Sequence, residues 1–92
     1  MEEIFIETAK DESEGIDLQY VIIRTKDTQL SDPVLNKVYS LLVVKTDDTY
    51  EKETMFIYDI ARNSDRAREI ARIMCANTVT PCTVTEVLDD IL

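Results

Sequence analysis

The chain has 92 residues, 45% hydrophobic and 32% charged, which is typical of one folded domain over residues 1–92. Nineteen acidic residues against ten basic ones give a net charge of −9, which disfavours nucleic-acid binding because phosphates repel an acidic surface. No apolar run approaches the roughly 20 residues that cross a bilayer, and no basic segment precedes an apolar one near Met1. We therefore expect a cytoplasmic protein without membrane contact.

The first sixty residues alternate in hydrophobicity with period two, which indicates strands. We expect strands over residues 3–8, 17–26, 51–60 and a third that begins at Val34 or Lys37 and ends at Thr46. Turn-like segments separate them at Gly15, at 27–33 and at 47–50. Strands joined by such short turns favour an antiparallel meander of three or four strands.

The hydrophobic period changes near Arg62, and two helices are expected after it. Two apolar stripes recur at helical spacing: Ala67, Ile70, Ala71 and Met74, then Val84, Val87, Leu88 and Ile91. Asn63 or Ser64 can cap the first helix, and Thr83 with Glu86 forms a capping box for the second. Neither helix can bury its stripe alone, so we predict an α+β fold with both C-terminal helices packed on one face of the sheet.

The predicted strands carry apolar residues on both faces. In the fourth strand, Met55 and Ile57 face one side, and Phe56, Tyr58 and Ile60 face the other. A sheet with one wet face should alternate more cleanly. Our hypothesis is that a second copy covers the second face, giving a homodimer. The alternative is that the first strand and the 27–33 loop fold over it.

Histidine and the glycine-rich phosphate loops, which many enzymes use, are absent from the sequence. There is no histidine, and the single glycine excludes the glycine-rich phosphate loops. Cys75 is expected to pack in the core. Cys82 follows Pro81 at the start of a helix, where the helix dipole can lower a thiol pKa, so a reactive thiol is a minor alternative there. The acidic segments 11–17 and 47–53 are expected to be solvated turns rather than metal sites. We therefore expect no enzyme, no cofactor and no bound metal.

Basic charge gathers on the first predicted helix. Four of the five arginines lie there: Arg62, Arg66, Arg68 and Arg72. Against them stand only Asp65 and Glu69, so this segment carries four positive and two negative charges. The arginines are expected on the side away from the apolar stripe. They form either a solvated helix face, supported by an Asp65–Arg68 pair, or a docking surface for an acidic partner or another copy.

The tail from Asn77 to Leu92 carries an Asn-x-Val-x-Pro pattern, then a helix that ends in acidic residues and a large apolar residue. In this it resembles a family of small uncharacterised clostridial proteins, classed as a domain of unknown function. Upstream, a strand pair followed by Asp59-Ile60 and a helix extends the resemblance over about residues 18–92. The resemblance implies a bacterial cytosolic protein and brings no activity, cofactor or catalytic residue.

Taken together, these features favour a protein-interaction or regulatory module, either self-associating or binding another protein. The alternative is a small-molecule-binding domain with a pocket between the helices and the sheet.

Overall fold

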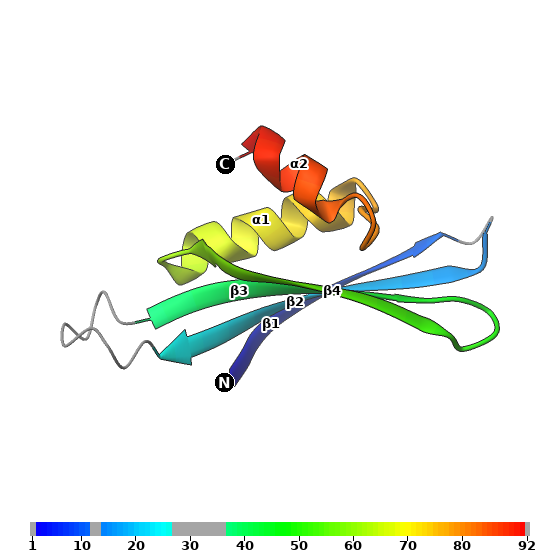
Figure 1. The fold of residues 1–92 in the computed structure, drawn as a ribbon, viewed down its shortest axis with the longest axis horizontal. Coiled ribbons are helices and arrows are strands. Elements are labelled where there is room, and N and C mark those ends of the chain that lie inside the picture. Colours follow the sequence, from blue (N-terminus) through cyan, green and yellow to red (C-terminus); the bar gives the residue numbers. More distant parts are fainter. Residues whose placement is uncertain (1, 12–13, 27–36, 92) are drawn as a thin grey trace.

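The computed structural model describes residues 2–11, 14–26 and 37–91, with only the backbone of Asp11. Four strands form one antiparallel sheet in the order β1-β2-β3-β4 (Figure 1). They are β1 (Glu2–Asp11), β2 (Ile16–Lys26), β3 (Lys37–Thr46) and β4 (Lys52–Ala61), followed by helices α1 (Ser64–Ala76) and α2 (Val84–Ile91). The predicted α+β meander with two C-terminal helices is confirmed, although β1 is longer than the predicted 3–8. The predicted 27–33 turn and a start at Val34 lie outside the described residues.

The main core lies between the sheet and the two helices, which share one side of the sheet (Figure 1). Alternate residues of β2 and β3 point into it, because side chains in a strand alternate between faces. The largest fully buried side chains on these strands include Tyr20, Ile22 and Leu41. The α1 stripe predicted from the sequence meets them: Ala67, Ile70, Ala71 and Met74 are all buried. Each large apolar side chain buried there stabilises the fold by about 1.5–3 kcal/mol.

Helix α1 begins and ends at polar residues that satisfy its free backbone groups. The side chain of Asn63 accepts a hydrogen bond from the Arg66 amide at 2.8 Å, which confirms the predicted N-cap. At the other end Thr78 adopts a left-handed conformation with φ of 45°. The Thr78 amide donates to the Cys75 carbonyl and the Val79 amide donates to the Met74 carbonyl. This is the Schellman pattern, in which glycine usually occupies the position that Thr78 holds.

The start of α2 differs from the predicted capping box. The Thr83 hydroxyl lies 3.1 Å from the Thr80 hydroxyl and 3.3 Å from the Thr80 carbonyl oxygen. Among the described residues it therefore bonds the preceding turn rather than the Glu86 amide. The turn around Pro81 brings Thr80 close enough to compete, so the Thr83–Glu86 signature is satisfied in a different way.

Strand β4 contains a bulge that changes the facing of Ile60. Leu41 pairs with Ile57, but Tyr39, two residues earlier, pairs with Ala61, so β4 has two extra residues opposite Ser40. Asp59 lies there with φ of 60°, and its amide donates to the buried Ser40 hydroxyl at 3.1 Å. The bulge turns Ile60 into the helix-side core. The prediction that Ile60 shares a face with Phe56 and Tyr58 is therefore wrong.

The β3–β4 hairpin closes through a turn organised by one carboxylate. Asp47 Oδ1 accepts hydrogen bonds from the Thr49 amide at 2.9 Å, the Thr49 hydroxyl at 2.6 Å and the Glu51 amide at 3.1 Å. Gly15, at φ 68° in the β1–β2 turn, lies against Asp48. A side-chain Cβ added at Gly15 would lie 3.5 Å from the Asp48 Cβ. The two hairpin tips thus meet beyond the helices (Figure 1).

Candidate functional site

The sheet face opposite the helices carries an apolar row that crosses all four strands. Ile6 pairs with Val21, Val21 with Leu42, and Leu42 with Phe56. Residues paired across an antiparallel ladder point to the same face, so these four side chains form one line. Neither helix lies on this side of the sheet (Figure 1). We call this line the apolar row.

The outer members of the apolar row are open to solvent. Ile6 is 51% exposed and Phe56 is 45% exposed, and Tyr58 beside Phe56 is 59% exposed. The inner members are more enclosed, since Leu42 is half-buried and Val21 is buried. Large aromatic side chains left in water on a strand are costly, which makes this row a candidate contact surface.

Part of the alternative explanation for this face is excluded by the topology. Strand β1 pairs with β2 at the edge of the sheet, so it extends the sheet instead of folding over it. The 27–33 segment, the other part of that alternative, lies outside the described residues.

The charges at the regular strand positions of this face balance. Glu3 pairs with Ile23, and Lys10 pairs with Asp17, whose carboxylate lies 3.9 Å from the Lys10 ammonium. Lys52 pairs with Thr46 at the far edge. Two acidic and two basic side chains thus flank the apolar row, although the whole chain has a net charge of −9.

The predicted arginine surface divides between two flanks of α1. Arg66 lies on the α2 side: its Nη1 is 2.7 Å from Glu69 Oε1, and its Nη2 donates to the Ile91 carbonyl at 2.9 Å. It therefore ties the last turn of α2 to α1. Arg62 pairs with Asp59 at 2.9 Å, just before the helix begins. These two arginines have contacts within the fold.

Arg68 and Arg72 lie one helical turn apart on the β1 side of α1. Their guanidinium carbons lie 5.5 Å and 5.3 Å from the centroid of the Phe5 ring, which is within cation–π range. In the part of the chain that the structure describes, no carboxylate forms an ion pair with either, and the predicted Asp65–Arg68 pair is not formed. The sequence did not indicate Phe5, because it lies sixty residues away on the first strand.

The two thiols have different surroundings. Cys75 is half-buried against the core, and its Sγ donates to the Thr8 carbonyl at 3.3 Å. Burial, with a smaller effect of the nearby Glu7 carboxylate, raises the pKa of the Cys75 thiol and keeps it protonated. Cys82 is exposed, 3.9 Å from Glu53 Oε2. The packing role predicted for Cys75 agrees with these contacts.

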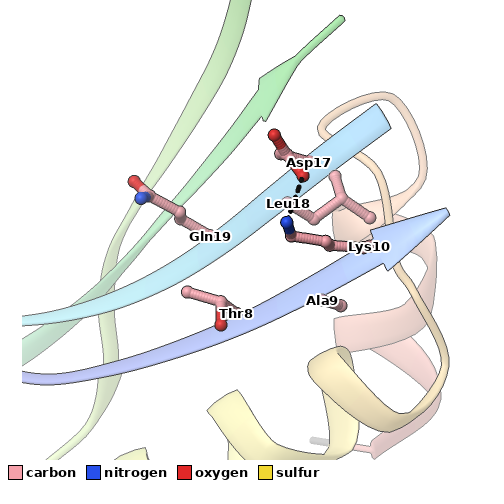
Figure 2. Close-up of a pocket in the computed structure, with 6 residues that line it drawn as sticks. All are labelled: Thr8, Ala9, Lys10, Asp17, Leu18 and Gln19. Atoms are coloured by element: carbon pink, nitrogen blue, oxygen red, sulfur yellow. Dashed lines mark ion pairs between the residues drawn. The ribbon is translucent and has the colours of Figure 1, made fainter. Parts of the chain in front are cut away.

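Figure 2 shows an open depression on the ribbon formed by β1 and β2. It encloses about 240 Å³ and is bridged by the Lys10–Asp17 ion pair. Its lining is Thr8, Ala9, Lys10, Asp17, Leu18 and Gln19. Small-molecule sites usually enclose about 300–1,000 Å³ and bury most of the ligand. This depression is smaller, and its lining lies on β1 and β2 rather than between the helices and the sheet, where the small-molecule alternative places a pocket.

Two further features are absent from residues 2–11, 14–26 and 37–91. Within them, no group of three or more histidine, cysteine, aspartate or glutamate side chains is arranged to hold a metal ion. Neither of the described helices has the length and apolar character needed to cross a membrane.

Comparison with known proteins identifies a family but no activity. A family model described as "Family of unknown function (DUF6514)" matches residues 1–92. The match covers more of the chain than residues 18–92, over which the resemblance to clostridial proteins extends. No curated protein and no solved structure matches the chain.

Proposed function

The chain belongs to DUF6514, a family of unknown function, and we propose that it is a protein-interaction module that pairs with a second copy of itself through the apolar row. The observation that carries this proposal is the exposure of Ile6, Phe56 and Tyr58 on the sheet face opposite the helices. Burying such side chains removes apolar surface from water, which is the main driving force of stable association.

The size of the face suits a dimer. Four strands about 4.8 Å apart, with ten residues of about 3.3 Å each, present roughly 600 Å². Two copies packed face to face would bury at most roughly 1,200 Å², because Val21, Ile23 and Val38 on this face are already buried, and this is the lower end of specific protein interfaces. A two-fold arrangement lets one patch serve both copies, so a single apolar row is sufficient.

Charge favours this face over the rest of the surface. Two chains that each carry −9 repel one another, and repulsion is weakest where the contacting surfaces are locally neutral. The two acids and two bases around the apolar row meet that condition. Lys10 of one copy can also approach acidic side chains of the other, which would fix the register.

In this proposal the protein is a non-catalytic module of a bacterial cytoplasm. The resemblance of Asn77–Leu92 to clostridial proteins supports the origin. The absence of histidine and of a glycine-rich loop in the sequence supports a role in binding rather than in catalysis.

The proposal is tested by gel filtration with light scattering at tens of micromolar protein. We expect a dimer, and we expect Phe56→Gln to weaken self-association by about tenfold or more, because aromatic side chains buried in an interface carry much of its energy. Tyr50→Gln is the matched control, since Tyr50 is an aromatic residue, 86% exposed, on the hairpin tip away from the apolar row. A monomeric native chain, or equal effects of the two substitutions, would refute the proposal.

A further inference from the structure

We infer that Arg68 and Arg72, held over Phe5, form a binding site for a carboxylate of an acidic segment in a partner protein. This site lies on the helix side of the sheet, at the β1 edge, and so is separate from the apolar row. It goes beyond self-association because it names a second contact and the chemistry of its ligand.

The other three arginines of the sequence have carboxylate partners. The sequence has nineteen acidic and ten basic residues, so an arginine readily finds a carboxylate within the fold. Arg24 pairs with Glu2, Arg62 with Asp59, and Arg66 with Glu69. Over the described ranges neither Arg68 nor Arg72 forms an ion pair, and both guanidinium groups lie over the Phe5 ring. The fold therefore leaves the acceptor of these two donors to come from elsewhere.

The guanidinium groups of Arg68 and Arg72 lie close to one another over the Phe5 ring. Residues four apart on a helix have neighbouring side chains, and like charges at that spacing repel. Here both are drawn to one aromatic ring, at 5.5 Å and 5.3 Å from its centroid. An anion bound between them would remove the repulsion. The ring holds the two planar groups in place, which lowers the entropy lost when they bind a ligand.

One hydrogen-bond donor of Arg68 is unsatisfied. The Nε of Arg68 is buried and has no hydrogen-bond partner among the described residues. A buried donor without an acceptor is costly. A carboxylate can accept side-on from Nε and Nη of one guanidinium, and a small rotation of Arg68 over the ring would turn its Nε–H toward such a ligand.

The surroundings favour a single carboxylate over a polyanion. Arg68 is half-buried and Arg72 is exposed, so a ligand can approach from the solvent side. Glu7 lies close enough to Cys75, on the same side of α1, to raise the pKa of that thiol. With a net charge of −9 around so small a positive site, a long phosphate backbone would meet repulsion on every side. One or two carboxylates on a flexible segment would not.

The direct test uses the native chain and a defined probe. The probe is a six-residue peptide that contains two glutamates between two leucines and is blocked at both ends. Its binding is detected by NMR of the arginine Nε–Hε groups. We expect the Arg68 and Arg72 signals to move at millimolar peptide while the Arg24 signal stays in place. The same peptide with glutamines in place of glutamates should produce no movement.

Variants separate the site from general charge. Arg68→Gln with Arg72→Gln is expected to weaken peptide binding by about tenfold or more, because charge-assisted hydrogen bonds are lost. The matched control is Lys26→Gln with Lys37→Gln, which removes the same charge from two exposed residues that pair with one another at the end of β2, four residues beyond Ile22, the partner of Phe5. This control should bind the peptide as the native chain does. Circular dichroism shows whether each variant is folded.

Three results would overturn the inference. They are no movement of the Arg68 and Arg72 signals, equal losses in the two double variants, or tighter binding of inorganic phosphate or an oligonucleotide than of the peptide. Peptide binding should persist in the Phe56→Gln variant. Failure of the carboxylate site and failure of self-association are therefore observed separately.

Discussion

At the scale of single residues, Tyr20 links the sheet to the turn between the helices. Its hydroxyl donates to the Val79 carbonyl at 2.7 Å, across 59 positions of the sequence. Burial, with a smaller effect of Cys75, raises the pKa of the Tyr20 phenol far above its ordinary value. Because this pKa is higher in the folded chain than in the unfolded one, the phenol stabilises the fold fully below about pH 10, and the stabilisation is lost as the pH rises further.

Replacing Tyr20 with phenylalanine tests this contact. The substitution keeps the ring but removes the donor, which leaves the Val79 carbonyl without its partner, and we expect a loss of about 1 kcal/mol in the free energy of unfolding. Urea unfolding at neutral pH measures it. Tyr50→Phe, at a side chain that is 86% exposed, should change the free energy little. If both variants unfold alike, the Tyr20–Val79 bond contributes no net stability.

Thr78 is a second residue whose conformation costs stability. Its φ of 45° is unfavourable for a β-branched side chain but ordinary for glycine. We expect Thr78→Gly to raise the free energy of unfolding by about 0.5–1 kcal/mol, because the Schellman hydrogen bonds are kept and the strain is removed. Thermal unfolding measures this. Thr80→Gly is the comparison, since Thr80 has no left-handed conformation to relieve, and a similar rise in that variant would contradict the explanation.

At the scale of elements, the β3–β4 hairpin depends on the ionised Asp47 side chain. The hydrogen bond from the Thr49 side chain is the largest of the effects that lower the pKa of the Asp47 carboxyl group. Because the folded pKa lies below the unfolded one, the turn is stabilised above about pH 4, the ordinary value for aspartate, and this is lost as the pH falls below it. Acid should therefore loosen this turn first.

Amide hydrogen exchange at Tyr50 and Glu51 tests the turn. After correction for the intrinsic rate, exchange should become severalfold faster as the pH falls below about 4. Asp47→Ala should exchange fast at every pH, because the carboxylate acceptor is missing. Asp48→Ala keeps that acceptor and should behave as the native chain does. A pH step that survives in Asp47→Ala would assign the effect to another group.

The elements also show what the sequence can and cannot predict. Period-two alternation and a capped apolar stripe are local signals, so the strands, α1 and the Asn63 cap were predicted. The facing of Ile60 was not, because it depends on a bulge stabilised by Ser40 nineteen positions earlier. The predicted Thr83–Glu86 capping box is absent for a similar reason: the Thr80 amide of the preceding turn donates to the Thr83 hydroxyl oxygen, which the cap would need as its acceptor.

The same reasoning applies to the candidate sites. Composition predicted that arginines gather near α1. It could not predict that Arg66 binds the end of α2 while Arg68 and Arg72 lie over Phe5, since these contacts join distant segments. The apolar row, by contrast, was foreseen as a two-sided strand pattern, and the sheet register shows which of its members lie in line.

At the scale of the whole molecule, the protein has two unlike sides. Both helices and the main core lie on one, and the apolar row lies on the other (Figure 1). In the proposed dimer the two apolar rows meet at the centre and the Arg68–Arg72 sites remain outside. Each dimer would then present two carboxylate sites, so a partner with two acidic segments would bind more tightly than one with a single segment.

Both outer strands of the sheet carry irregular pairing. The register shifts between Glu3 and Phe5 in β1, and β4 bulges around Asp59. An open sheet with two regular edges can add strands without limit and grow into fibres, whereas bulges interrupt the backbone template that such growth requires. The irregular pairing of β1 and β4 therefore opposes the addition of further strands at the sheet edges. Copies in contact through the open face would then form a closed pair rather than a polymer.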